Sequence, residues 1–146
     1  MTSKTLRSVV ADANVLLSAL TGGASRRVFE RLRVFRIVTT DVAAEEIREH
    51  LPGLAAKYGL DSDYLLELFE VLPIEIVPEA GYKSRLSEAR KYLAKRDPDD
   101  VHVLALALKR ELPIWSNDGD FDDTPVTVYP TAMLLKVLGF PSTRPR

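Results

Sequence analysis

Short apolar runs rich in β-branched residues alternate with longer stretches of helical periodicity, and this alternation limits what the chain can fold into. The first run, at residues 8–11, reads Ser-Val-Val-Ala, and similar runs lie at residues 36–39, 74–77, 114–116 and 126–129. Parallel strands need a helical crossover that covers one sheet face. The order therefore predicts an α/β fold with a mainly parallel central sheet between layers of helices.

Capping residues and chain breakers mark the helices expected between these runs. Asp97 can cap a helix that has Pro98 at its first position, and Pro52-Gly53 is expected to stop an earlier helix near Leu51. The predicted helices cover residues 25–33, 40–51, 61–72, 84–95, 98–110 and 131–138.

Size and composition predict one globular domain. The chain has 146 residues, 46% of them hydrophobic and 28% charged, so we expect a domain over residues 1–140 and a frayed tail over 141–146. Lys plus Arg total 20 against 21 Asp plus Glu, and this balance gives no overall electrostatic argument for nucleic acid binding.

The absence of cysteine excludes several kinds of chemistry. Disulfides, thiolate zinc sites and a cysteine nucleophile are impossible, and a reducing, cytoplasmic location is expected. The apolar stretch at residues 9–20 is interrupted by Asp12 and Asn14, so we expect neither a signal peptide nor a membrane span.

Common cofactor and nucleophile motifs are missing as well. The chain contains no G-x-G-x-x-G, no G-x-x-x-x-G-K-[ST] and no G-x-S-x-G, and His50 and His102 are too far apart in sequence for a two-histidine metal motif. The remaining candidates for chemistry are carboxylates.

Acidic residues follow two of the predicted strands. In open α/β sheets ligands bind at the carboxyl ends of the strands, which favours Asp12 after the first strand and Asp118 after the run at 114–116. Asp12 could instead cap a helix, and the acidic turn at residues 117–123 could be a solvated loop. Within that turn Asp120 is a plausible outer member of a site.

Helix phase selects two further acids. Glu46 borders the apolar face of its helix, whereas Glu45 points away. Asp100 lies one turn before Leu104 on the covered side of its helix, whereas Asp99 is expected to face solvent, where the helix dipole accounts for it.

These acids occur in segments that resemble the four acidic motifs of PIN domains. The segments keep the order of those motifs, and the likeness covers nearly the whole chain; they are Val10–Val15, Glu46–Ile47, Asp100–Ala107 and Ser116–Phe121. The chain looks most like bacterial and archaeal PIN proteins described as toxin components of toxin–antitoxin systems, the VapC-like ribonucleases.

The resemblance implies a three-layer α/β/α sandwich, a divalent metal site and cleavage of single-stranded RNA. The catalytic acids would be Asp12, Glu46, Asp100 and Asp118, although the neighbouring Asp99 leaves the register of the third acid open. Mg²⁺ or Mn²⁺ would be held by Asp12, Asp100, Asp118 and Asp120, because both ions prefer oxygen ligands. Asn14 and Ser116 would support the site.

Partners are expected on the same grounds. The resemblance implies a small antitoxin protein and a homodimer. Basic side chains could follow an RNA backbone, although ordinary solvated helix faces would account for them equally well; they are Arg26, Arg27, Arg31, Arg33, Lys95 and Arg96.

Two alternatives stay open. A PIN-like module could bind RNA or a partner without cutting, in which case one or more acids should be missing, yet all four are present. A phospho-acceptor signalling domain would need an acceptor Asp after a middle strand and a Lys after a later one, and the segments at residues 39–41 and 115–117 do not supply them convincingly.

Overall fold

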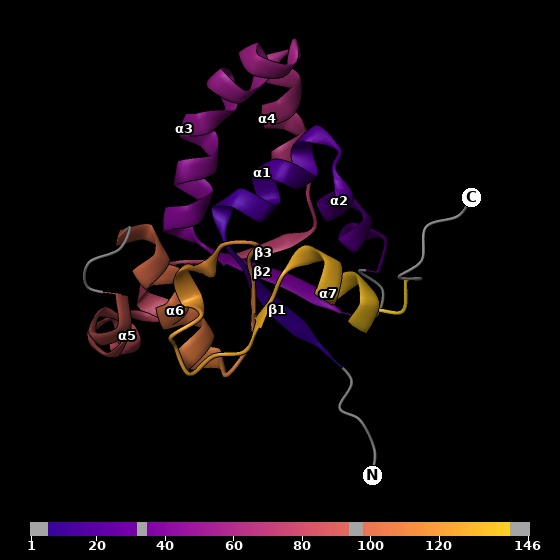
Figure 1. The fold of residues 1–146 in the computed structure, drawn as a ribbon. Helices are drawn as coiled ribbons and strands as arrows, with labels where there is room; N and C mark the ends of the chain where they lie inside the picture. The colour runs from indigo at the N-terminus through magenta and orange to yellow at the C-terminus, as the bar shows by residue number, and fades with distance from the viewer. Residues whose placement is uncertain (1–5, 32–34, 94–97, 141–146) are drawn as a thin grey trace.

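All five strands of the central sheet run parallel. A computed structural model describes residues 6–31, 35–93 and 98–140, and places the strands in the order β3-β2-β1-β4-β5 (Figure 1). The strands are β1 (Ser8–Ala11), β2 (Arg36–Thr40), β3 (Ile74–Val77), β4 (Ile114–Trp115) and β5 (Val128–Tyr129). The predicted α/β class is confirmed. The expected tail at 141–146 and the expected Asp97 cap lie outside the described residues.

Seven α-helices occur in the described residues. They are α1 (Ala13–Thr21), α2 (Ala24–Val28), α3 (Asp41–Tyr58), α4 (Ser62–Glu70), α5 (Leu86–Leu93), α6 (Pro98–Arg110) and α7 (Thr131–Val137). Short 3-10 turns occupy residues 29–31, 79–81, 83–85 and 119–121. Every helix in this part of the chain is too short or too polar to span a lipid bilayer.

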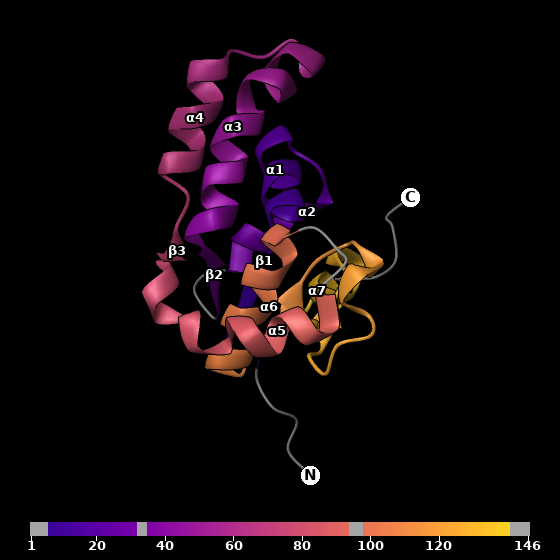
Figure 2. The same cartoon turned by 90° about the vertical axis from the view of Figure 1, so that its left-hand side faces the viewer.

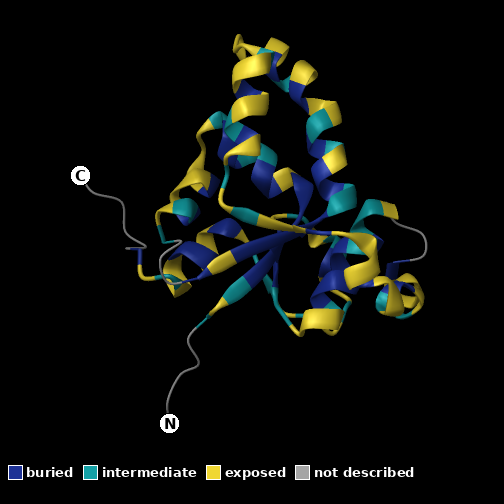
Figure 3. Ribbon diagram, turned by 180° about the vertical axis from the view of Figure 1, so that it is seen from behind, coloured by how far each residue is buried: buried dark blue, intermediate teal, exposed yellow. Residues whose placement is uncertain are grey.

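The two faces of the sheet carry separate hydrophobic cores. Val9 packs with α1, α3, α4 and α7, whereas its neighbour Val10 packs with α5 and α6 on the other side. Successive side chains of a strand point to opposite faces, so a buried parallel strand must be apolar throughout. Figure 3 shows the result: the strands at the centre of the sheet, β1, β2 and β4, are mostly buried, and exposed surface lies on the outer sides of the helices. The three-layer α/β/α arrangement is confirmed.

Helix α3 continues past the point where the sequence predicted its end. Pro52 lies inside the helix, which ends at Gly59 in the left-handed conformation (φ 67°). A proline inside a helix removes one backbone hydrogen bond. Leu51 and Ala55 are both buried beside it, so packing on either side of Pro52 opposes that local cost.

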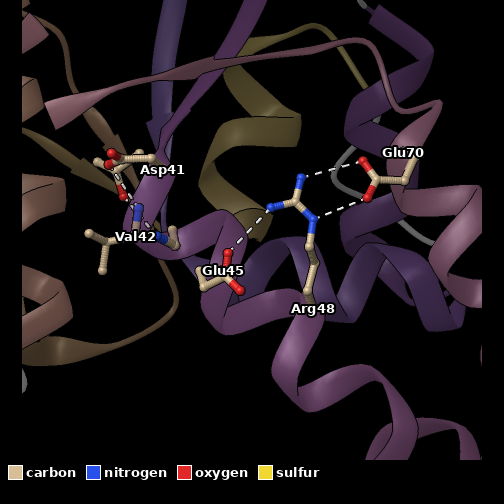
Figure 4. Close-up of polar contacts among 7 residues, drawn as sticks. Asp41, Val42, Glu45, Arg48 and Glu70 are labelled. Carbon is tan, nitrogen blue, oxygen red and sulfur yellow. Dashed lines mark hydrogen bonds and ion pairs between the residues drawn. The ribbon is translucent and has the colours of Figure 1, made fainter.

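Helices α3 and α4 form an arm that extends beyond the sheet (Figure 2). The arm is held by Arg48 of α3, whose Nε and one terminal nitrogen donate to the two carboxylate oxygens of Glu70 at 3.1 and 3.4 Å (Figure 4). The guanidinium also lies 5.4 Å from the centre of the Phe69 ring. Polar and aromatic contacts of one side chain therefore tie α4 to α3.

Candidate functional site: an acidic pocket at the strand ends

One pocket contains every acid that the sequence singled out. It opens where β1 and β4 end and where α1, α3 and α6 begin, at the carboxyl edge of the sheet. Its lining residues are Asp12, Ala13, Asn14, Ala43, Glu46, Asp99, Asp100, Val103, Asp118 and Asp120. Acids from four separate segments of the chain are thus brought together by the topology.

Asp12 follows β1 directly and is the most deeply buried acid of the pocket. Its side chain is buried, and one carboxylate oxygen accepts from the Val15 amide at 3.0 Å, which caps α1. The expected capping role is therefore real, and it coexists with a place in the pocket. Burial raises the pKa of the Asp12 carboxyl, Asp118 raises it further by repulsion, and hydrogen bonds from Ser116, Val15 and Asn14 oppose the rise.

Ser116 joins Asp12 to the loop that follows β4. The buried Ser116 hydroxyl donates to the Asp12 carboxylate, and its oxygen accepts from the Asp118 amide at 3.1 Å. Between the strands, the Asp12 amide donates to the Trp115 carbonyl at 3.3 Å. The relative position of Asp12 and Asp118 is consequently fixed by both backbone and side-chain hydrogen bonds.

Thr39 and Asn117 support the same edge from either side. The buried Thr39 hydroxyl donates to the Ala11 carbonyl at 2.7 Å, next to Asp12. The Asn117 side-chain oxygen accepts from the Thr131 amide at 2.7 Å, which attaches the loop after β4 to the start of α7. Both bonds hold strand ends and not strand centres in place.

Glu46 enters the pocket from α3, as its helical phase indicated. Glu46 is half-buried and lines the pocket, while its neighbour Glu45 is exposed and lies 3.8 Å from Arg48. The start of α3 is fixed by Thr40, whose hydroxyl oxygen accepts from the Ala43 amide at 2.9 Å.

The prediction that Asp99 faces solvent is wrong. Asp99 and Asp100 are both half-buried, and both line the pocket with Val103. At about 100° per residue, Val103 lies between the two acids around the helix axis. The phase argument failed because five consecutive residues, 103–107, are buried, so α6 has no narrow apolar face from which a phase can be read. The structure does not separate Asp99 from Asp100.

Comparison with known proteins identifies the family. The family model described as PIN domain matches residues 10–135. The chain belongs to the PIN-domain family. No curated protein matches it in sequence.

Solved structures resemble this PIN domain in fold at low sequence identity. A VapBC2 complex from Rickettsia felis bound to promoter DNA matches with a TM-score of 0.68 and 15% identity, covering 84% of this chain and 97% of that one. DNA-bound VapBC from Salmonella typhimurium matches with a TM-score of 0.67 and 18% identity, covering 86% and 98%. FitAcB from Neisseria gonorrhoeae matches with 0.61 and 19%, covering 84% and 97%. These likenesses establish the fold.

The chemistry of the pocket suits a hard divalent cation held with several waters. In the described part of the chain no group of three or more Asp, Glu or His side chains is already arranged to hold a metal ion. Mg²⁺ commonly takes only one or two carboxylates and completes its shell with water and substrate phosphate. An oxygen-only, acidic pocket with a buried Asp12 fits that kind of ion, although it is not a preformed protein cage.

Three of the basic RNA-contact candidates, Arg26, Arg27 and Arg31, lie in the described part of the chain and have structural contacts, and no described arginine lines the pocket. Arg26 donates to the Ala19 and Leu20 carbonyls at 3.0 and 2.9 Å, where α1 ends. Arg27 and Arg31 lie over the Phe140 ring at 4.7 and 4.3 Å. Contact of these arginines with RNA stays a prediction, and the other three basic candidates, Arg33, Lys95 and Arg96, lie outside the described residues.

Sequence reasoning passed over a polar cluster beside the pocket. Tyr82, buried, donates its hydroxyl proton to Asp41 at 2.7 Å and lies 2.8 Å from Nδ1 of His102. His102 was set aside because no second histidine lies near it in sequence, and Tyr82 is separated from its partners by 41 and 20 positions. Only contacts made by the folded chain could reveal this cluster.

Proposed function

We propose that this PIN-domain protein is an endoribonuclease that uses Mg²⁺ or Mn²⁺ to cut single-stranded RNA. The observation that carries the proposal is the convergence of Asp12, Glu46, Asp100 and Asp118 on one pocket at the strand ends. A carboxylate is costly to bury unless something positive meets it. The buried Asp12 therefore supports a site that receives a cation.

Each acid has a role in the proposed reaction. Asp12, Asp100 and Asp118 hold the ion directly or through water, with Asp120 as an outer ligand. When bound, the ion stabilises charge on the scissile phosphate and lowers the pKa of a water molecule. Glu46 orients the attacking water and takes its proton as the water oxygen bonds to phosphorus. The bond to the leaving oxygen breaks, and that oxygen keeps the electron pair and takes a proton from solvent. Asn14, exposed beside Asp12 at the pocket, supports the site as a polar side chain.

The biological setting we propose is a toxin–antitoxin pair in the cytoplasm. The solved structures that this fold resembles include VapBC complexes from Rickettsia felis and Salmonella typhimurium and a toxin–antitoxin complex from Klebsiella pneumoniae, which supports a small antitoxin as partner. We also propose a homodimer, to be tested by light scattering of the purified protein.

The test is cleavage of defined nucleic acids by the purified protein. Single- and double-stranded RNA and DNA are incubated with Mg²⁺, Mn²⁺ or EDTA, beside Asp12→Asn protein purified in the same way. We expect cutting of single-stranded RNA by the wild type, loss of cutting in EDTA, and loss in the variant. Cutting that persists in EDTA but not in Asp12→Asn protein would contradict the metal mechanism while keeping the site.

A non-catalytic PIN module is the second candidate. It is favoured by one observation, the lack of a preformed group of three metal-ligating side chains among the described residues. Binding of single-stranded RNA without cleavage under every metal condition would select this alternative. A signalling domain gains no support, because no lysine is among the described residues that line the pocket.

A further inference from the structure

Three side chains from distant parts of the sequence form one hydrogen-bonded chain beside the acidic pocket. The Tyr82 hydroxyl donates to Asp41 Oδ1 at 2.7 Å and lies 2.8 Å from Nδ1 of His102. The Tyr82 and His102 rings meet edge to face, with centres 5.6 Å apart. Asp41 belongs to α3, His102 to α6, and Tyr82 to the segment between β3 and α5.

The donors and acceptors in this chain are determined by its chemistry. A hydroxyl has one proton, and Tyr82 gives it to a carboxylate that can only accept. His102 must therefore donate from Nδ1 to the Tyr82 oxygen. Burial, followed by the hydrogen bond to Asp41, raises the pKa of the Tyr82 hydroxyl, so the hydroxyl stays protonated.

Asp41 is held from three directions. Its Oδ1 also accepts from the Val42 amide at 2.9 Å, and its Oδ2 accepts from the Glu79 amide at 3.0 Å (Figure 4 shows the Val42 bond). The carboxylate thus fixes the segment that carries Tyr82 against the first turn of α3. Tyr82, the buried member of this cluster, thus has its hydroxyl hydrogen-bonded, and a buried polar group with satisfied partners gives a specific and rigid contact.

The hydrogen bonds of Tyr82 connect α3 and α6, and each of these two helices contributes acids to the pocket. Glu46 lies five residues after Asp41 on α3, and Asp100 lies two residues before His102 on α6. Because a helix moves as a rigid element, the separation of Asp41 from His102 sets the separation of Glu46 from Asp100. Tyr82 is the residue that bridges them.

We propose that Tyr82, Asp41 and His102 act together as positioning residues that set the spacing of α3 and α6 and thereby the geometry of the acidic pocket. The consequence for catalysis rests on the proposed nuclease function, whereas the consequence for helix spacing does not. Side chains that orient metal ligands typically change metal affinity or activity by about 10–100-fold when they are removed.

The first measurement tests the spacing alone. The chain has no native cysteine, so spin labels can be attached at Glu49→Cys on α3 and Lys109→Cys on α6, both exposed positions. Double electron–electron resonance then gives the distance distribution with Tyr82 and with Tyr82→Phe, which keeps the ring and removes both hydrogen bonds. We expect a broader or shifted distribution in the variant. An unchanged distribution would overturn the proposal.

The second measurement tests the pocket. Mn²⁺ binding, followed by electron paramagnetic resonance with the metal alone, should weaken by about tenfold or more in Tyr82→Phe, and kcat for RNA should fall by more than KM rises. His102→Asn, whose amide nitrogen can replace Nδ1 as donor, should keep more Mn²⁺ affinity than His102→Ala.

Ser25→Ala is the control. The buried Ser25 hydroxyl also has a side-chain partner, Thr131 at 3.3 Å, but it lies on α2 and connects neither α3 nor α6. It should lower the melting temperature without changing helix spacing or Mn²⁺ affinity. Equal effects of the two variants would make Tyr82 a general stability residue and overturn the proposal. A wild type that binds no Mn²⁺ and cuts no RNA, with spacing still dependent on Tyr82, would reject the proposed nuclease function only.

Discussion

The fold shifts the pKa of a strand-end carboxyl and the pKa of a surface carboxyl in opposite directions. Asp12 is buried at the end of β1, and burial raises the pKa of its carboxyl. Glu75, exposed on the edge strand β3, receives two hydrogen bonds from Arg110 at 3.0 and 2.8 Å, which lower the pKa of its carboxyl.

The difference indicates which acids the fold needs for itself. The Glu75–Arg110 pair joins β3 to the end of α6 and gives each charge an opposite neighbour. Asp12 is placed at a cost, with Asp118 adding repulsion. Strained groups of this kind persist where function maintains them, so the strand-end acids are the candidates for chemistry and the surface acids are not.

Removing the buried carboxylate should have the largest effect. Asp12→Asn retains an oxygen for the Val15 amide but loses the charge that would hold a cation. Charge stabilisation by a metal contributes several kcal/mol, so we expect kcat to fall by about 100-fold or more in RNA cleavage assays. Glu75→Gln, its surface counterpart, should retain activity. Equal loss in both variants would remove the distinction between the two regions.

Metal binding should stabilise the strand-end region specifically. Ions that bind the folded pocket and hardly bind the unfolded chain add about 2.7 kcal/mol when free metal is a hundred times its dissociation constant. Scanning calorimetry with and without Mg²⁺ or Mn²⁺ measures this gain. The gain should disappear in Asp118→Asn and persist in Glu75→Gln. A gain that survives in Asp118→Asn would assign Asp118 to the turn alone and direct attention to Asp120.

Removing the Ser116 hydroxyl, which connects Asp12 with Asp118, should have an intermediate effect on activity or metal affinity. Ser116→Ala removes the donor to Asp12 and the acceptor of the Asp118 amide. We expect activity or metal affinity to fall by about 10–100-fold, as for other groups that orient metal ligands. Ser8→Ala, at the opposite end of β1, is the control and should leave both quantities unchanged. A loss in Ser116→Ala but not in Ser8→Ala would show that the carboxyl end of the sheet supports the site and that its amino end does not.

The sequence predicted the strands closely because their signal is local. Residues 8–11 and 74–77 are both short runs rich in β-branched residues, a pattern that can be read without reference to the rest of the chain. The one charged residue in these two runs, Glu75, lies on the exposed edge strand β3. Local rules failed where distant packing opposed them. Pro52 did not end α3, because Leu51 and Ala55 are buried on either side of it, and the nearly complete burial of α6 left no phase that could separate Asp99 from Asp100.

The acidic residues of the pocket could be selected from the sequence, but most of the residues that hold them in place could not. Asp12 and Asp118 follow strands, and topology alone brings strand ends together. The Tyr82 bridge depends on how α3 and α6 pack, which no nearby residue encodes. A motif therefore indicates which groups perform chemistry, and only the folded chain shows which groups hold them in place.

The carboxyls of Asp12 and Glu75 should make stability depend on pH with opposite signs. The Asp12 carboxyl should make stability fall as pH rises. Because the pKa of the folded carboxyl lies above the ordinary aspartate value of 3.8, the folded state binds more protons than the unfolded state between the two pKa values. Stability from this group therefore falls as pH rises through that window. Relative to the wild type in EDTA, Asp12→Asn should gain stability with rising pH and show no pH-dependent difference below 3.8. Urea unfolding at several pH values measures this.

Glu75 should give the smallest effect, with the reverse sign. Its folded pKa lies below the ordinary glutamate value of 4.5, so the ion pair stabilises the fold above that pH, and the stabilisation is lost as pH falls through the folded pKa. The pair is largely solvent-exposed, with side-chain exposures of 37% and 55%, and such pairs contribute only about 0.2–1 kcal/mol. Glu75→Gln should therefore cost that amount near neutral pH and nothing well below the folded pKa, measured by the same urea titrations. Salt should reduce the cost, because exposed charges are screened, whereas it should change the Asp12 effect less. A Glu75 effect that is large, insensitive to salt and greater at low pH would mean that β3 and α6 need this pair for the fold, and the contrast between surface and strand-end carboxylates would no longer hold.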